Sequence, residues 1–109
     1  MNDVKEKYSG WDVVEYRYMK PIIGFEDRYQ ITSDGKVWSL QTKRFLAAAP
    51  NPSGYLHLTL KRNGLKRTFD VHRLVAVHFI ENPLDKKEVN HLNGDKSDNR
   101  VENLEYVPS

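Results

Sequence analysis

The sequence predicts an α+β protein in which a small antiparallel β module precedes a short helix-and-hairpin segment. Asp34-Gly35 lies between two β-favouring runs, which is a strong local signal for a hairpin. Leucines alternate with polar residues over 55–60, which is the period of a half-buried strand. An apolar helical face follows Asp70 and must end before Pro83. A length of 109 residues suits one domain or two small modules sharing a core.

The first 69 residues contain the predicted β module. Residues 1–10 are polar and predict a flexible tail. The module begins at Trp11, although residues 11–18 follow neither the strand period of 2 nor the helix period of 3.6 clearly. Strands are expected over 29–32 and 36–40, joined by a turn at 33–35. Asn63-Gly64 reverses the chain after the strand at 55–60, and residues 66–69 begin the returning strand.

Residues 70–109 form the second predicted module. Asp70 is a candidate N-cap for a helix over about 72–80, whose apolar face contains Leu74, Val75, His78 and Phe79. Residues 88–92 predict a strand, Asn93-Gly94 begins a turn, and residues 101–106 predict the returning strand.

The composition excludes several classes of protein. The chain is 39% hydrophobic and 29% charged, as in an ordinary folded domain, and lacks a membrane-length apolar run or signal-peptide core. It has no cysteine, so neither disulfides nor thiolate metal sites are expected, and a reducing cytoplasmic location is compatible. There is no nucleotide-binding loop and no sign of a Ser/His/Asp triad.

The charge distribution is strongly uneven along the chain. Residues 36–73 contain eight Lys/Arg and one Asp, a net charge of +7, whereas residues 1–35 and 74–109 carry −2 and −3. Basic residues interleaved with aromatic and β-branched ones suit a polyanion, although a solvated basic face is an equal alternative from charge alone.

His91 is the candidate for catalysis. An imidazole can take a proton from water near neutral pH, and phosphodiester hydrolysis also needs a divalent cation held by oxygen ligands. Asn90 would supply one such oxygen. The alternative is a polar hairpin loop with an incidental histidine. The spacing fits neither an EF-hand nor a zinc site.

Several linked stretches, in the same order, resemble a family of phage homing endonucleases. Residues 21–39 (PIIGFEDRYQITSDGKVWS), with Trp11 before them and residues 54–60 after them, are similar to the DNA-associated module called NUMOD4. Residues 71–76 (VHRLVA), 89–96 (VNHLNGDK), Asn99 and residues 102–106 (ENLEY) resemble the HNH nuclease motif of those enzymes.

The resemblance implies a role for each matching residue. His91 would be the general base, Asn90 a ligand of Mg²⁺ or Mn²⁺, and Asn103 the residue that orients the loop carrying His91. His72 and Arg73 would support the site from the second shell or the fold. The basic module would lie along double-stranded DNA, with phosphate contacts expected from Lys43, Arg44, Lys61, Arg62, Lys66 and Arg67.

The resemblance also implies the fold of the nuclease segment, and this chain departs from that fold at its C-terminal end. The family has a ββα-metal nuclease core, in which a helix after the second strand brings the last metal ligand. In this chain the segment matching that strand is followed only by residues 107–109, so a C-terminally truncated motif is expected.

Two functions follow. The first is a metal-dependent HNH endonuclease that nicks DNA, without a nucleotide cofactor or membrane partner. The second is a catalytically weak or inactive DNA-binding protein that keeps the fold. Oligomeric state is not determined by the sequence.

Overall fold

The computed structural model describes residues 18–109. The tail expected at 1–10 and the start of the module at Trp11 lie outside the described residues. In chain order the elements are β1 (Met19–Pro21), β2 (Tyr29–Thr32), β3 (Val37–Ser39), β4 (Arg44–Phe45), β5 (Ala49–Pro50), β6 (Leu56–Arg62), β7 (Leu65–Asp70), α2 (Val71–Phe79), β8 (Glu88–His91), the 3₁₀ turn η1 (Val101–Asn103) and β9 (Leu104–Val107).

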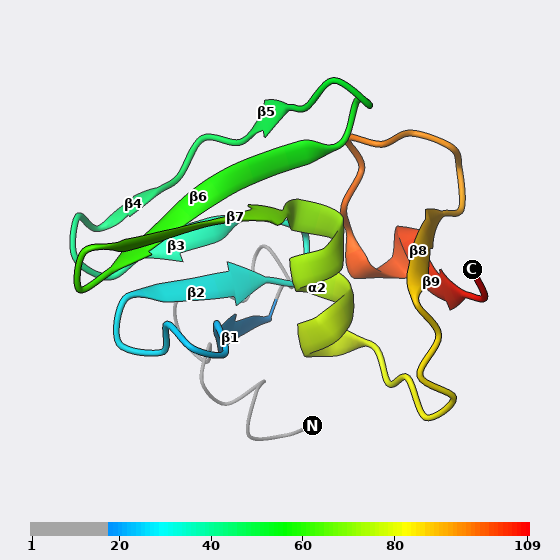
Figure 1. Cartoon of the computed structure of the whole chain (residues 1–109), viewed down its shortest axis with the longest axis horizontal. Helices are drawn as coiled ribbons and strands as arrows, with labels where there is room; N and C mark the ends of the chain where they lie inside the picture. The colour runs from blue at the N-terminus through cyan, green and yellow to red at the C-terminus, as the bar shows by residue number, and fades with distance from the viewer. Residues whose placement is uncertain (1–17) are drawn as a thin grey trace.

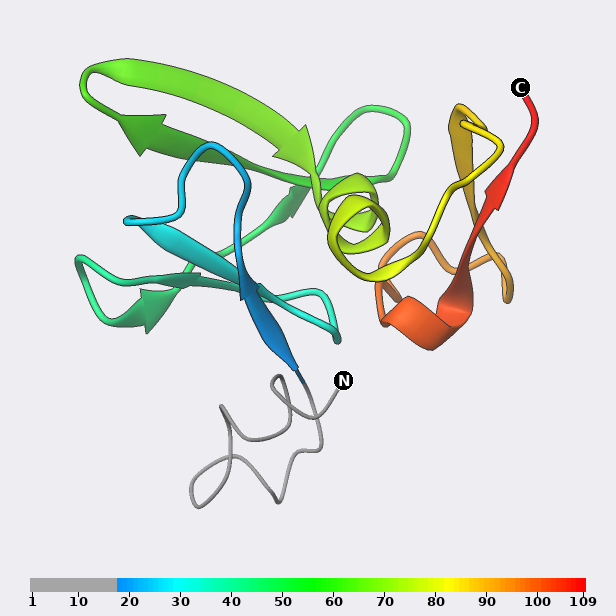
Figure 2. The same cartoon turned by 90° about the horizontal axis from the view of Figure 1, so that it is seen from below.

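Three antiparallel sheets surround the helix. The first has the order β1-β2-β3-β4, the second β5-β6-β7, and the third is the β8–β9 hairpin. In both views α2 lies between the β6–β7 hairpin and the β8–β9 hairpin (Figures 1 and 2). The predicted α+β class with antiparallel strands is confirmed.

The turns form where the sequence places small residues with access to positive φ. Gly35 has a φ of 89° and closes the β2–β3 hairpin, whose register pairs Ile31 with Val37. Asn63 and Gly64 both have positive φ at the tip of the β6–β7 hairpin. Since these positions require the left-handed region, the predicted turns match the structure at both hairpins.

A single apolar core joins the two predicted modules. Leu58 and Leu60 are buried on one face of β6, as their alternation predicts. Helix α2 is rich in β-branched residues, so it owes its stability to burial against the sheets. The buried cluster combines residues of the sheets and of α2: Ile22, Phe25, Ile31, Val37, Leu58, Leu60, Val71, Leu74, Val75, Ala76, Val89 and Leu104.

Three local predictions need correction. Residues 101–103 form a 3₁₀ turn and not a strand, because the Val101 N–H donates to the Ser33 carbonyl in the β2–β3 turn before β9 begins. The helix spans Val71–Phe79, and Asp70 occupies its N-cap position without a side-chain capping hydrogen bond. The short strands β1, β4 and β5 were not predicted, because two or three residues give no readable period.

His78 is a structural histidine, as expected for one on the apolar face of a helix. Its Nδ1 lies 2.8 Å from the Leu74 carbonyl, and its Nε2 accepts from the Ile23 N–H at 3.0 Å. Both ring nitrogens therefore bond to the backbone, and the side chain joins α2 to the segment after β1.

Candidate active site on the β8–β9 hairpin

The β8–β9 hairpin and its long connecting loop present the candidate site. His91 ends β8 and pairs with Leu104 at the start of β9. The Leu92 N–H donates to the Asn103 carbonyl at 2.8 Å, and the Gly94 N–H donates to the His91 carbonyl at 3.0 Å. The chain thus turns sharply just after His91, and its loop returns to the same end of the hairpin.

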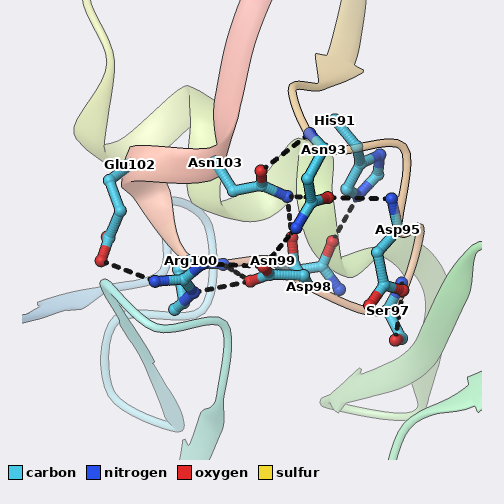
Figure 3. Close-up of polar contacts among 9 residues, drawn as sticks. All are labelled: His91, Asn93, Asp95, Ser97, Asp98, Asn99, Arg100, Glu102 and Asn103. Carbon is cyan, nitrogen blue, oxygen red and sulfur yellow. Dashed lines mark hydrogen bonds and ion pairs between the residues drawn. The ribbon is translucent and has the colours of Figure 1, made fainter.

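Asn103 ties this loop together through its side chain. Its amide oxygen accepts from the Asn93 N–H at 3.1 Å, and its amide nitrogen donates to Asn93 Oδ1 at 3.0 Å and to the Asp98 carbonyl at 2.8 Å (Figure 3). Only 5% of Asn103 is exposed. Removing this amide would therefore leave part-buried loop groups without their partners.

The acidic residues of the loop are engaged within it. Arg100 forms a two-pronged ion pair with Asp98, with Nε–Oδ1 and Nη2–Oδ2 distances of 2.7 and 2.8 Å. The hydrogen bonds from Arg100 hold the pKa of Asp98 far below its usual range. Asp95 accepts from the hydroxyl and the N–H of Ser97, which lowers the pKa of Asp95. These carboxylates stabilise the loop conformation.

His91 lies in a cluster of rings drawn from three elements. Its ring centroid lies 5.0 Å from that of His72 at the start of α2 and 5.9 Å from that of Tyr55 beside β6, and these two stack at 4.7 Å. His91 Nε2 lies 2.7 Å from Oδ1 of Asn99 (Figure 3). With 6% of its surface exposed, His91 is held by packing and by one buried hydrogen bond.

The ring cluster makes the stability of the protein sensitive to acid. Burial, with the nearby His91 and Arg73, lowers the pKa of His72 from 6.5 to about 4. Between these values the unfolded chain binds a proton that folded His72 does not, so the free energy of unfolding falls as pH is lowered from 6.5 to 4. Above pH 6.5 this contribution is constant.

We expect His72→Phe to flatten this acid dependence, because phenylalanine keeps an aromatic ring and does not titrate. The wild-type free energy of unfolding should fall by up to about 3 kcal/mol more than that of the variant across the window. Urea denaturation at several pH values measures both slopes. Burial also lowers the pKa of His78. His78 is present in both proteins, so it adds the same pH dependence to the free energy of unfolding of each. Equal slopes in the two proteins would contradict the assignment to His72.

Arg73, named with His72 as a supporting residue, links α2 to β8. Its Nη1 donates to the Lys87 carbonyl at 3.0 Å, and its Nη2 lies 3.2 Å from Glu88 Oε1. Arg73 therefore helps to set the position of the hairpin against the helix.

The structure places Asn90 and His91 on opposite faces of β8. Burial alternates along the strand, so that Val89 and His91 point inward and Asn90 points outward. Asn90 Nδ2 donates to Glu105 Oε2 at 3.1 Å across the hairpin. His91 and Asn103 are thus brought together through their loop, whereas Asn90 pairs with a carboxylate that the sequence did not single out.

The oxygen donors on this outer face partly suit a divalent cation. Mg²⁺ takes oxygen ligands, keeps several waters and is commonly bound with substrate phosphates. Asn90 and Glu105 supply an amide oxygen and a carboxylate. Within residues 18–109, no cluster of three or more His, Cys, Asp or Glu side chains could hold a metal. The donor set therefore fits a weakly held cation that a phosphate helps to bind.

The basic residues gather at the end of the β module away from the β8–β9 hairpin. Lys61 and Lys66 are exposed and paired directly across β6 and β7, and the β3–β4 turn with Lys43 and Arg44 lies at the same end (Figure 1). Like charges facing each other across a hairpin are unfavourable without a counter-charge. This arrangement suits a polyanionic partner.

Arg62 differs from the other predicted DNA contacts. Its Nη1 donates to the Gly24 carbonyl at 3.0 Å, and its Nε lies 3.5 Å from Asp27 Oδ1. The guanidinium thus connects the hairpin tip to the loop before β2. Arg28 was not predicted as a DNA contact, yet it lines the same pocket as Lys61 and Lys66. Its Nη1 donates to Gln41 Oε1 at 3.3 Å.

Sequence reasoning gave no role to two residues of the site. Asn99 appeared only as part of a motif, although its amide contacts His91. Tyr55 stacks on His72, and Lys96 of the loop lies 4.6 Å from the centre of the Tyr55 ring and donates to the Ser53 carbonyl at 2.8 Å. No sequence spacing links Tyr55 to His91, since they lie on separate elements.

The fold and site correspond to a nuclease segment joined to a DNA-associated module. Residues 70–109 match the family model described as HNH endonuclease, and residues 20–61 match the NUMOD4 motif. The resemblance to phage-type HNH homing endonucleases with a NUMOD4-like module is therefore confirmed.

Individual relatives agree with this assignment. The chain is 38% identical over 88 residues to DNA endonuclease I-HmuI of Bacillus phage SP01. The aligned residues cover 81% of this chain and 51% of that protein. The solved structure titled "DNA binding and cleavage by the HNH homing endonuclease I-HmuI" matches with a TM-score of 0.78 and 37% identity, over 83% of this chain and 52% of that one.

A second relative comes from a virus of amoebae. The "Uncharacterized HNH endonuclease L247" of Acanthamoeba polyphaga mimivirus is 44% identical over 90 residues, which cover 80% of this chain and 22% of that protein. The chain therefore spans between about a fifth and a half of the length of these relatives.

In residues 18–109, no helix has the length and apolar character needed to cross a membrane.

Proposed function

We propose that this chain acts in metal-dependent hydrolysis of DNA phosphodiesters, as an HNH-type endonuclease that nicks double-stranded DNA. The observation that carries the proposal is the loop held by Asn103, which fixes the backbone just after His91. A basic hairpin packed on the same apolar core supplies the surface for the DNA backbone. In this function, residues 11–69 are the DNA-binding module and residues 70–109 are the nuclease segment.

His91 is the general base in this proposal. It takes a proton from water, the water oxygen bonds to phosphorus, and the bond from phosphorus to the leaving sugar oxygen breaks. Asn103 holds the loop that carries His91 and makes no contact with the scissile phosphate. A divalent cation, Mg²⁺ or Mn²⁺, when bound would stabilise the charge that develops on the phosphate oxygens. Asn90 would hold that cation, with Glu105 beside it, from the face of β8 opposite to His91.

The first test is a supercoiled-plasmid assay with Mg²⁺ or Mn²⁺, an EDTA control and a parallel gel shift. We expect relaxed plasmid in the presence of metal and none with EDTA. A gel shift without nicking under any metal condition would contradict the nuclease proposal and favour a DNA-binding protein that keeps the fold. Absence of both would contradict the nuclease proposal and the DNA-binding alternative.

The basic hairpin makes a separate prediction about salt. We expect the double variant Lys61→Gln/Lys66→Gln to bind duplex DNA more weakly and to lower the slope of log K against log salt by about 1.8, or 0.9 for each lost phosphate contact. Gel shifts or fluorescence anisotropy over a range of salt concentrations measure the slope. Because the two ammonium groups repel each other across the hairpin, their removal should not lower the melting temperature.

A matched double variant controls for net charge. Lys86→Gln/Lys87→Gln also removes two positive charges, but from the segment before β8, where Lys87 pairs with Asp85. We expect it to keep most of the wild-type salt slope. Equal effects of the two double variants would show that only net charge matters and would contradict a specific role for the hairpin tip.

A further inference from the structure

Asn99 is anchored from a part of the chain far away in sequence. It is 4% exposed, and its Cβ would lie 2.9 Å from a Cβ added at Gly35, in the β2–β3 turn. The Asn99 carbonyl oxygen would lie 3.0 Å from the same added carbon. Next to it, the Val101 N–H donates to the Ser33 carbonyl at 2.8 Å. The turn of the first module therefore packs directly on the residue that contacts His91.

The contact between Asn99 and His91 has a definite polarity. Oδ1 of an asparagine only accepts hydrogen bonds, so an imidazole nitrogen 2.7 Å away must carry the proton. That nitrogen is Nε2, which leaves Nδ1 with the lone pair of the neutral ring. Within residues 18–109, no group forms a hydrogen bond with Nδ1 of His91.

We propose that Asn99 is a positioning residue that holds His91 in the Nε2–H tautomer, with Nδ1 as its basic atom, and that the Gly35 turn of the first module holds Asn99 in place. The inference rests on the proposed function for the use of Nδ1 as the base, but the tautomer itself does not depend on catalysis. The two modules are then not independent, because the turn of one fixes the chemistry of the other.

The decisive measurement is the tautomer of His91 by ¹⁵N NMR of the imidazole nitrogens, at about pH 8 where an ordinary histidine is neutral. We expect the Nε2–H form in the wild type, and a mixture of tautomers in Asn99→Leu, which lacks the acceptor. Asn99→Asp keeps an acceptor oxygen and should retain the Nε2–H form. The Nδ1–H form in the wild type would overturn the proposal, whether or not any variant folds.

Nicking rates then test the consequence for catalysis. Asn99→Leu should nick about 10- to 100-fold more slowly, the range found when a residue supporting a site is lost, and Asn99→Asp should recover most of that loss. Glu102→Gln is the control, since Glu102 is exposed in η1, after the same loop, and among the described residues it pairs with Arg100 alone. A wild type that shows the Nε2–H tautomer but does not nick would support the positioning role while contradicting the proposed nuclease function.

A variant outside the nuclease segment tests the link between the modules. Gly35→Ala should displace Asn99 and produce the same mixture of tautomers, because the added Cβ has no room. Gly24→Ala is the matched control, since Gly24 has a φ of 88° and an added Cβ there meets nothing within 4 Å. Both changes strain the backbone alike, but only the first touches Asn99. An unchanged tautomer in folded Gly35→Ala would overturn the proposed link.

Discussion

His91→Ala is expected to abolish nicking while leaving DNA binding intact. A general base contributes about 10²- to 10⁴-fold to a rate, and alanine cannot accept the proton of the attacking water. Strand β8, which ends at His91, lies away from the tip of the β6–β7 hairpin (Figure 1), so the loss of His91 should not change the gel shift. Plasmid nicking in Mg²⁺ or Mn²⁺ measures the first effect, and a binding titration at fixed salt measures the second.

His57→Ala is the matched control for this experiment. His57 lies on β6 and pairs in register with Ala49 and Asp70, and within residues 18–109 it forms none of the ring contacts that join Tyr55, His72 and His91. We expect its nicking rate to stay near the wild-type value. Circular dichroism of both variants would show that the fold is kept. Nicking by His91→Ala at the wild-type rate would exclude His91 as the base.

Asn103→Ala is expected to have the second largest effect, through the loop and not through the chemistry. The change removes three hydrogen bonds from a buried site and leaves the Asn93 N–H and the Asp98 carbonyl without their partners. A fully buried group left unpaired costs about 1 to 3 kcal/mol, and these two groups are part-buried, so water offsets some of that cost. We expect a loss of about 1 to 3 kcal/mol in the free energy of unfolding, together with a large loss of nicking.

Asn82→Ala separates these two effects. Asn82 also ties a loop together, donating to the Lys86 carbonyl at 2.8 Å and accepting from the Lys86 N–H at 2.9 Å. It lies before β8 and does not contact the loop that follows His91. We expect a smaller loss of stability and nearly full nicking below the melting temperature. If the two variants lose nicking equally at matched stability, Asn103 has no particular role in presenting His91.

Much of the fold was predictable because its signals are local. Glycines and asparagines with positive φ mark the hairpin tips at Gly35 and Asn63-Gly64, where other residues are strained. The leucine alternation in β6 identifies its buried face, and Pro83 limits the helix to the residues before it. The strands of two or three residues escaped prediction, because their pairing comes from neighbouring segments.

The candidate site was predictable only in part. The sequence indicated His91 and Asn90 by their chemistry, and a resemblance gave Asn103 its role. The structure brings Asn103 to the loop that follows His91. The sequence did not indicate that Asn90 and His91 face opposite sides of β8, or that Arg62 pairs with Asp27. It also gave no role to Asn99 or Tyr55, which touch the candidate base or its neighbour.

The sequence by itself determined the order of the elements, the turns between them, the basic block and the loop that carries His91. These depend on backbone preferences and on periodic burial, which act over a few neighbouring residues. The tertiary structure decided which nitrogen of His91 faces Asn99, which rings pack against His91 and which turn supports Asn99. Those contacts join residues from separate sheets and the helix, and only the packing of the shared core brings them together.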